Sequence, residues 1–292
     1  MQLLNRAGSG FVALETTLLV HGVPQPEAAP LAKRLADAVR AGGGEPALVG
    51  IVAGRPIVGL TDDELTTLLE AGGGGRVEKV NTANLGIILH RKQHGATTVS
   101  TTVELAARAG IRVMATGGIG GVHRGFASTL DISADLGTLA RCPVAVVTSG
   151  VKSILDVAAT RELLETLGVP VVGYRTDTFP AFYVRQTNIP LDARFDDAKD
   201  LATYVSAELA RTGRGVVVAN PCPEAEAMSS EAWEALLARA TPTTTTGRNA
   251  TPAMLAQIHT RSGGASLRAN IALAEANARL AGALCSAMGS VR

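Results

Sequence analysis

Short, unbroken apolar runs recur along this chain and alternate with segments of helical periodicity. Residues 144–148 (VAVVT) and 215–219 (GVVVA) are typical, because each is valine-rich and holds no charged residue. A strand with one solvated face alternates apolar and polar residues, whereas a strand buried on both faces reads as a continuous apolar run. The sequence therefore predicts an α/β fold: a three-layer α/β/α sandwich around a mainly parallel, mixed sheet.

The helical segments are recognised by their apolar spacing and by the signals at their ends. Thr61 is predicted to cap one helix, because Glu64 follows three residues later and completes a capping box. A single domain is expected over residues 1–292, with a loop at 241–246 between two late helices. Strands are predicted at 11–14, 47–52, 56–58, 77–80, 97–99, 113–115, 144–148, 169–173 and 215–219. Helices are predicted at 27–41, from Thr61 to the glycines at 72–75, and at 85–90, 103–109, 130–140, 153–167, 198–212 and 267–287.

Composition limits the classes of protein to which the chain can belong. Hydrophobic residues make up 46% of the 292 residues but aromatic residues only 3%, so the core must be built from Val, Ile, Leu and Ala. A formal net charge of +1 argues against a nucleic-acid or membrane partner attracted by bulk charge. No apolar stretch approaches the roughly 18–20 residues of a membrane span, and the first residues lack a cleavable signal pattern. Three scattered cysteines fit a cytoplasmic location and predict neither a disulfide framework nor a zinc site.

Glu15 lies inside the run FVALETTLLV, which is otherwise suited to burial. An ionised carboxylate there is costly unless it is paired, hydrogen-bonded or placed at a strand end that faces a cleft. Two interpretations stay open. Glu15 is either a structural carboxylate that holds backbone or Arg groups, or a functional acid or base.

Lys152 follows the predicted strand 144–148 and a Ser-Gly turn, and it precedes the predicted helix 153–167. This order places it outside the carboxyl end of a parallel strand, where α/β sheets bind ligands. In a partly dry crevice a lysine loses its charge more readily and becomes a nucleophile towards a carbonyl-like carbon. The alternative is a solvated lysine at a helix start.

Asp131 and Asp135, in TLDISADL, are four residues apart at a predicted helix start and are expected to share one face of it. One interpretation is that both carboxylates stabilise the positive end of the helix dipole. The other is that they lie beside Ser133 to hold a hard divalent ion such as Mg²⁺ or Mn²⁺.

A glycine cluster at 117–121 precedes His123 and Arg124. Such a loop offers backbone N–H groups to an anion, and either basic side chain could add charge. The cluster does not fit GxGxxG, and residues 146–153 do not fit a Walker A loop. Dinucleotide binding and P-loop nucleotide hydrolysis are therefore disfavoured.

Eight motifs, in order along the chain, carry a resemblance to one family. They are ALETTLLVHGVPQP (13–26), EKVNTANL (78–85), HGATTVSTT (94–102), ATGGIGGVHRG (115–125), TLDISADL (129–136), GVKSILD (150–156), VVANPCPE (217–224) and SLRANIALAEANA (266–278). With these motifs the chain resembles the pseudouridine-5'-phosphate glycosidase family, which includes the indigoidine synthase A-like proteins.

The resemblance implies reversible cleavage of the C–C bond between uracil and ribose 5-phosphate in pseudouridine 5'-phosphate. In the family a lysine attacks the anomeric carbon, opens the ribose and forms an imine-type adduct, and Lys152 matches that lysine. Glu15 matches the general acid/base, and Asp131 matches the residue that carries a divalent metal, usually Mn²⁺, largely through waters. The substrate-binding positions implied by the resemblance are Lys79, Val99, His123, Ser133, Ala134, Asp135 and Asn270. The resemblance also implies a homotrimer with a small-molecule substrate and neither a nucleic-acid nor a membrane partner.

Two segments depart from the family pattern. Many members carry a Ser-Arg-Arg-Asp-like sequence where residues 81–84 read NTAN, and Gly-Lys-Glu where residues 247–249 read GRN. Charge is lost from both places, so a polar network is expected to replace an ionic one if the two segments touch. The altered segment 81–84 favours one alternative, a C-glycosidase of the same family that handles a different base. A second alternative, from another class of protein, is a non-catalytic sugar-phosphate binder.

Overall fold

The computed structural model describes residues 2–239 and 250–290. In these residues eleven strands form one sheet, and the two antiparallel pairings are those of β3 with β4 and with β6. The remaining ladders are parallel, so the predicted mainly parallel, mixed sheet is confirmed. The strand order is β1 (Leu4–Asn5), β4 (Arg55–Val58), β3 (Glu45–Val52), β2 (Phe11–Glu15), β7 (Val113–Ala115), β8 (Ala145–Thr148), β11 (Val216–Ala219), β9 (Val171–Tyr174) and β10 (Ala193–Phe195), with β6 (His94–Thr97) joining β3 to β5 (Val77–Val80).

Both faces of the sheet are buried, as the continuous apolar runs predict. In β11, Val216 and Val218 contribute to one core, and Val217 and Ala219 contribute to the other. Helices α2 (Gln25–Ala41), α9 (Ala198–Thr212) and α12 (Ala265–Ser290) cover the first face. Helices α4 (Leu85–His90), α5 (Val99–Arg108), α7 (Ala134–Leu139) and α8 (Val157–Thr166) cover the second. The three-layer α/β/α sandwich is therefore confirmed.

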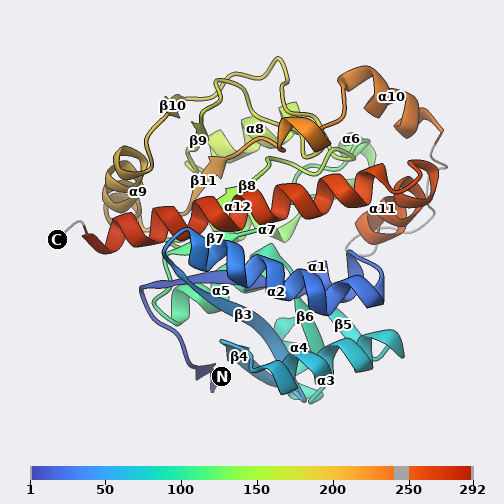
Figure 1. The fold of residues 1–292 in the computed structure, drawn as a ribbon, viewed down its shortest axis with the longest axis vertical. Coiled ribbons are helices and arrows are strands. Elements are labelled where there is room, and N and C mark those ends of the chain that lie inside the picture. Colours follow the sequence, from blue (N-terminus) through green and yellow to red (C-terminus); the bar gives the residue numbers. More distant parts are fainter. Residues whose placement is uncertain (1, 240–249, 291–292) are drawn as a thin grey trace.

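Helices α2 and α12 lie side by side across the sheet (Figure 1). Their backbones approach closely because glycines meet at the crossing. A Cβ at Gly282 would lie 2.2 Å from the Val39 carbonyl oxygen, and one at Gly42 would lie 2.3 Å from the Arg279 carbonyl oxygen. This crossing fixes α12 against the carboxyl-terminal part of α2.

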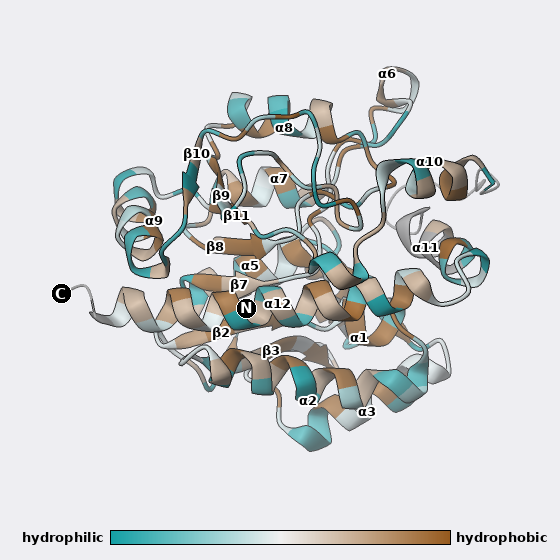
Figure 2. Cartoon of the chain, turned by 45° about the horizontal axis from the view of Figure 1, so that its top comes forward, coloured by the Kyte–Doolittle hydropathy of each residue, from teal (hydrophilic) through white to brown (hydrophobic). Residues whose placement is uncertain are grey.

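The core uses aliphatic side chains, as the low aromatic content requires. Figure 2 shows hydrophobic colouring on the central strand β8 and mixed colouring on α2. One side of α2 is buried through Ala28, Leu31, Leu35, Ala38 and Val39, which recur at helical spacing. In the part of the chain that the structure describes, no helix is long and apolar enough to cross a membrane.

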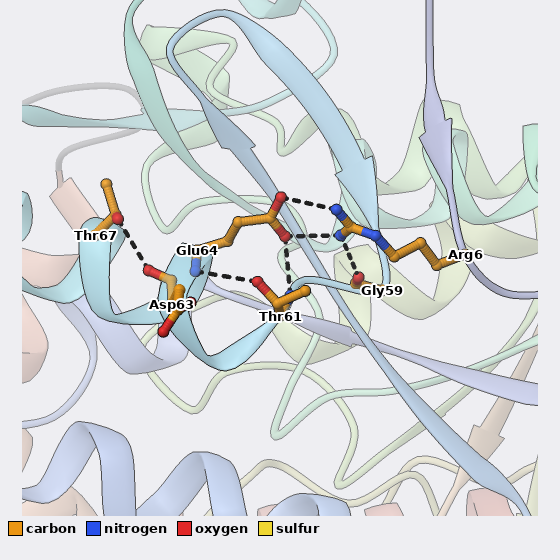
Figure 3. A network of polar contacts seen from close by, with 6 residues as sticks. All are labelled: Arg6, Gly59, Thr61, Asp63, Glu64 and Thr67. Carbon is orange, nitrogen blue, oxygen red and sulfur yellow. Dashed lines mark hydrogen bonds and ion pairs between the residues drawn. The ribbon is translucent and has the colours of Figure 1, made fainter.

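The capping box predicted at Thr61 is present at the start of α3 (Asp62–Gly73). The Thr61 hydroxyl accepts from the Glu64 N–H (3.3 Å), and the Glu64 carboxylate accepts from the Thr61 N–H (2.9 Å). Arg6 donates to both oxygens of the same carboxylate (2.7 and 2.9 Å) and to the Gly59 carbonyl (2.9 Å), as Figure 3 shows. The helix start is thus tied to the amino-terminal strand.

Several predicted boundaries are wrong, and three of these errors lie beside the predicted site. The strand placed at 97–99 is β6, which ends at Thr97, and Val99 opens α5. The helix placed at 130–140 begins at Ala134, because Leu130 adopts a left-handed conformation (φ 53°) and Ser133 caps α7. The helix placed at 153–167 begins at Val157, after its cap Asp156.

The remaining helices are short or lie towards the carboxyl end. They are α1 (Thr17–His21), α6 (Phe126–Thr129), the 3₁₀ helix η1 (Glu224–Glu226), α10 (Ser230–Ala238) and α11 (Ala250–Arg261). The loop predicted at 241–246 and the departure at 247–249 lie outside the described residues. The polar network expected if segments 81–84 and 247–249 touch therefore stays a prediction.

Candidate active site

The two residues predicted to do the chemistry lie where neighbouring parallel strands end. β2 ends at Glu15, its neighbour β7 leads into Thr116, and β8 leads through a turn to Lys152. The carboxyl ends of parallel strands share one edge of the sheet. Glu15 and Thr116, which are 101 positions apart in the sequence, therefore come into contact there.

The cleft at this edge has two chambers, and both are lined by Glu15, Thr17, Lys79 and Lys152. The phenylalanine chamber is completed by Leu18, His21, Gly22, Thr116, Gly117, Gly118, Phe182 and Asn270. The aspartate chamber is completed by Asn81, Thr98, Gly120, His123, Asp131, Ile132, Ser133, Ala134 and Asp135. The structure therefore places every site residue implied by the resemblance in the wall of one or both chambers except Val99. Arg124, the other basic residue after the glycine cluster, lines a different pocket.

Glu15 is 8% exposed and accepts a short hydrogen bond from the Thr116 hydroxyl. Burial raises the pKa of the Glu15 carboxyl above its ordinary value. The positive charge of Lys152 and the Thr116 hydrogen bond oppose that rise without cancelling it. A carboxyl with a raised pKa that faces a cleft can hold a proton and release it, which favours the acid/base interpretation of Glu15.

Lys152 is half-buried in a turn that is fixed by backbone hydrogen bonds. Its N–H donates to the Ile119 carbonyl (3.1 Å), and its carbonyl accepts from the Leu155 N–H (2.9 Å). A Cβ added at Gly118 would lie 3.3 Å from Lys152 Cγ, so the lysine stem runs along this glycine. Because α8 starts five residues later and Lys152 lines both chambers, a solvated lysine at a helix start does not describe this residue.

The carboxylate of Asp135 binds the glycine loop from inside the protein. It accepts from the Gly120 N–H (2.8 Å) and from the Ser100 N–H at the start of α5 (2.9 Å). The sequence predicted that this loop presents N–H groups to an anion, and at Gly120 that anion is Asp135. The expectation that Asp131 and Asp135 share a helix face is wrong, because Asp131 precedes the cap of α7.

Gly120 leaves no room for a side chain, because a Cβ there would lie 2.5 Å from Ser133 Cβ and 2.9 Å from Asp135 Oδ2. We expect Gly120→Ala to lower the free energy of unfolding by about 1–3 kcal/mol through overpacking. Gly137→Ala, inside α7 and 3.7 Å from the nearest other side chain, is the matched control and should be neutral or stabilising. Thermal unfolding measures both variants, and equal stability in the two would contradict this steric account.

His123 and Asp131 lie close together in the wall of the aspartate chamber. Their Nδ1 and Oδ2 atoms are 3.8 Å apart, and the His123 N–H donates to the Asp131 carbonyl (3.0 Å). Burial lowers the pKa of His123, and nearby Asp131 opposes that change. The strand-like pairing of Val122 with Ile132 fixes the spacing of the two segments.

The donors around Asp131 fit a hard divalent ion that keeps most of its waters. Asp131 is half-buried, and Ser133, Asn81 and Thr98 bring further oxygen atoms to the same chamber. Within residues 2–239 and 250–290, no three His, Cys, Asp or Glu side chains form a metal cluster. Mg²⁺ and ions like it bind through one or two carboxylates and waters, so a single carboxylate is compatible with such a site.

Val99 can meet a ligand only through its backbone. Its side chain is 1% exposed and lies in the core. Its N–H is among the first amides of the ten-residue helix α5, and the preceding Thr98 lines the aspartate chamber. Amides at a helix start favour an anion such as a phosphate.

Thr97, in the motif HGATTVSTT, is committed to the fold. It is fully buried, and its hydroxyl donates to the Val49 carbonyl (2.7 Å). Its N–H donates to the Thr16 hydroxyl (3.0 Å), which itself donates to Val49 (2.8 Å). These bonds hold Thr16 against β3 and β6, and so they position the carboxylate of the neighbouring Glu15.

The phenylalanine chamber contains two buried polar atoms that make no hydrogen bond within the described structure, Asn270 Oδ1 and His21 Nε2. Asn270 is 2% exposed, and burial, followed by the charge of Lys79, lowers the pKa of His21. Buried polar atoms are normally paired, so both atoms are suited to a polar ligand. Phe182, with a left-handed φ of 56°, supplies a flat apolar wall.

Sequence reasoning missed several wall residues. Thr17, His21 and Thr116 stand in motifs that were recognised, but nothing in their pattern distinguished them from core residues. Phe182 carries no sequence signal, because it lies outside every motif and reaches the cleft through the loop after β9.

The departure at residues 81–84 forms a self-contained turn before α4. Asn84 Oδ1 accepts from the Asn81 N–H (2.8 Å), and Asn81 Oδ1 accepts from the Ala83 N–H (3.0 Å). Asn84 Nδ2 also donates to the Lys79 carbonyl (3.1 Å). The turn therefore holds the backbone at Lys79. Asn81 is the residue of this turn that lines the aspartate chamber, and its side chain is uncharged.

Comparisons with known proteins agree with the sequence resemblance. The sequence profile of the family described as "Indigoidine synthase A like protein" matches residues 3–287. A pseudouridine-5'-phosphate glycosidase of Methylobacterium nodulans is 46% identical over 98% of this chain and 86% of its own length. One from Geobacillus kaustophilus is 47% identical over 93% of this chain and 91% of its own length.

Two solved structures share the fold. An indigoidine synthase A-like protein from Thermotoga maritima has a TM-score of 0.89 and 35% identity, covering 97% of this chain and 95% of its own. The prealnumycin C-glycosynthase AlnA, solved with ribulose 5-phosphate, has a TM-score of 0.86 and 37% identity, covering 97% of this chain and 92% of its own.

Proposed function

We propose that this chain, which belongs to the family of indigoidine synthase A-like proteins, is a pseudouridine-5'-phosphate glycosidase that reversibly cleaves pseudouridine 5'-phosphate to uracil and ribose 5-phosphate. The observation that carries the proposal is that Glu15 and Lys152 both lie in the wall shared by the two chambers. A sugar-phosphate binder without activity needs neither a buried carboxyl nor a lysine at that place.

A carbon leaving group is not released as readily as an oxygen, so its departure needs an electron-donating group on the anomeric carbon. The Lys152 Nζ adds to the anomeric carbon while the ring C–O bond breaks and the ring oxygen takes a proton. The nitrogen lone pair then forms a C=N bond as the C–C bond breaks, and the departing uracil carbon takes a proton. Water hydrolyses the imine, which restores the lysine and releases ribose 5-phosphate. Glu15, with its raised pKa, holds and transfers protons in these steps.

The two chambers divide the substrate between them. The base lies in the phenylalanine chamber, where Phe182 offers a flat face and Asn270 an unpaired amide oxygen. The phosphorylated sugar lies in the aspartate chamber, near Lys79, His123, residues 133–135 and the first amides of α5. This arrangement places the C–C bond between the chambers, beside both Glu15 and Lys152.

The proposed activity is tested with the purified chain, pseudouridine 5'-phosphate and Mn²⁺, with released uracil measured by chromatography. The reverse reaction is tested with uracil and ribose 5-phosphate. Absence of reaction in both directions from a folded protein would contradict the proposal.

We propose that Asp131 holds Mn²⁺ or Mg²⁺, largely through waters, beside the sugar phosphate. The ion supplies positive charge for the oxygen atoms in that chamber. We expect Asp131→Asn to weaken Mn²⁺ binding by about tenfold or more, because a carboxylate ligand is lost. Titration of Mn²⁺ followed by electron paramagnetic resonance measures the affinity. Asp37→Asn, an exposed change on α2, is the control, and unchanged affinity in the Asp131 variant would refute this assignment.

A second candidate is a C-glycosidase of the same chemistry that handles a different base. The neutral turn at 81–84 and the similarity to a C-glycosynthase favour it. Reverse coupling with uracil and with substituted pyrimidines separates the two, since the preferred base reacts with the highest kcat/KM.

We also propose a homotrimer that works in the cytoplasm. The free cysteines Cys142, Cys222 and Cys285 fit a reducing compartment, and the mass in solution tests the trimer.

A further inference from the structure

α12 carries a second buried asparagine, Asn277, which contacts residues that follow three parallel strands. Its Nδ2 donates to the carbonyl oxygen of Thr116 after β7 (2.8 Å) and to the hydroxyl of Ser149 after β8 (3.1 Å). Its Oδ1 accepts from Asn220 Nδ2 after β11 (2.9 Å). One fully buried amide therefore links the helix to the edge of the sheet where the cleft lies.

Core packing alone does not require an amide at this position. The buried neighbours of Asn277 on α12, such as Leu273, Ala274 and Ala278, are apolar. The Thr116 and Gly117 carbonyls, however, lie beyond the end of β7, and Asn277 Nδ2 donates to both of them (2.8 and 3.4 Å). The Gly117 carbonyl also accepts from the Ser149 N–H (2.9 Å), so backbone pairing continues there. The Thr116 carbonyl accepts from no backbone N–H in the described residues, and the Asn277 amide gives this carbonyl its partner.

Thr116 connects this amide to the acid/base. Its carbonyl accepts from Asn277, and its hydroxyl donates to the Glu15 carboxylate. We propose that Asn277 is a positioning residue, which holds Thr116 so that its hydroxyl meets Glu15 and so sets the proton affinity of that carboxyl. A role of Asn277 in catalysis rests on the function proposed above, whereas its influence on the proton affinity of Glu15 does not.

The charged groups that face Glu15 come from other elements than α12. Lys152, Asp135 and Lys79 act on it directly, and their charges partly oppose one another. His21, His123 and Asp131 line the same cleft. A change at Asn277 leaves these six side chains in place and removes the support of the Thr116 hydrogen bond. Because that bond stabilises the ionised carboxylate, its loss raises the pKa of Glu15.

The test is a pH titration of the Glu15 carboxyl by ¹³C nuclear magnetic resonance on protein labelled at glutamate, with its signal assigned from its loss in Glu15→Gln. We expect Asn277→Ala to move the midpoint upward by about one pH unit, the size of one hydrogen bond to a charged group. Thr116→Val should produce the same shift directly. The double variant should add nothing further, since both changes remove one interaction.

Leu280→Ala, a cavity change in the same helix away from the cleft, is the control for loosened packing and should leave the midpoint unchanged. If Asn277→Ala does not fold, Asn277→Ser replaces it, because serine is too short to reach the Thr116 carbonyl. An unchanged midpoint in the Asn277 variant beside a shifted one in Thr116→Val would overturn the inference, as would an equal shift in Leu280→Ala. This titration needs no turnover, so a failure of the proposed glycosidase activity is recognised separately, by the absence of uracil release.

Discussion

Replacement of Lys152 by alanine is expected to abolish uracil release, lowering kcat by a factor on the order of 10⁴ or more. Without the amine, the anomeric carbon gains no nitrogen, so no lone pair can form the C=N bond that drives the uracil carbon off. The fold should persist, because the turn at Lys152 is held by backbone bonds to Ile119 and Leu155 that an alanine retains.

Borohydride trapping gives a second measurement of the same prediction. Ribose 5-phosphate should form an imine with Lys152 that borohydride reduces to a stable secondary amine, and peptide mapping locates it. Lys152→Arg should form none, although its charge is kept, and the exposed Lys33→Ala should trap as the unsubstituted protein does. Full turnover in either Lys152 variant would exclude the covalent route.

Glu15→Gln is expected to lower kcat by about 10²–10⁴-fold, the usual contribution of a general acid or base. The amide keeps the size of the side chain and an oxygen for the Thr116 hydroxyl, but it cannot exchange a proton. Steady-state kinetics of uracil release measures the loss. Glu64→Gln, in the capping box remote from the cleft, is the control for kinetics, and equal activity in both variants would remove Glu15 from the mechanism.

The same variant should be more stable than the unsubstituted protein at neutral pH. Burial raises the pKa of Glu15 in the folded state above its unfolded value. Between these two values the folded chain binds the proton and the unfolded chain does not, so stability falls as pH rises through that window. The neutral amide of Glu15→Gln removes this loss of stability. Thermal unfolding at several pH values should show the stability of the variant and that of the unsubstituted protein converging at acid pH.

The sequence was sufficient for the layers of the fold but not for the geometry at the strand ends. Valine-rich runs that are buried on both faces have few alternatives to a parallel sheet, so the sandwich follows from them. The start of α7 could not be read, because Leu130 adopts a left-handed conformation that its identity does not predict. The prediction that Asp131 and Asp135 share one face of a helix was therefore wrong, although both residues line the aspartate chamber.

A site residue could be predicted when its type is unusual for its sequence surroundings, as with the carboxylate of Glu15 in an apolar run. A site residue was missed when its type is ordinary and only the tertiary structure brings it to the cleft. Phe182 arrives on a loop far along the chain, and Thr116 becomes important only because Glu15 lies opposite it. No periodicity or local pattern contains such pairings, since they depend on which strands are neighbours in the sheet.

The position of α12 has a consequence for how the protein is made. Synthesis runs from the amino end, so this helix leaves the ribosome after every described strand of the sheet has been translated. Until it docks against α2, the cleft lacks Asn270 in its wall and the Thr116 carbonyl lacks its amide partner. The candidate site is therefore complete only when α12 has packed against the sheet, so folding of one face of the core and assembly of the cleft end in the same step.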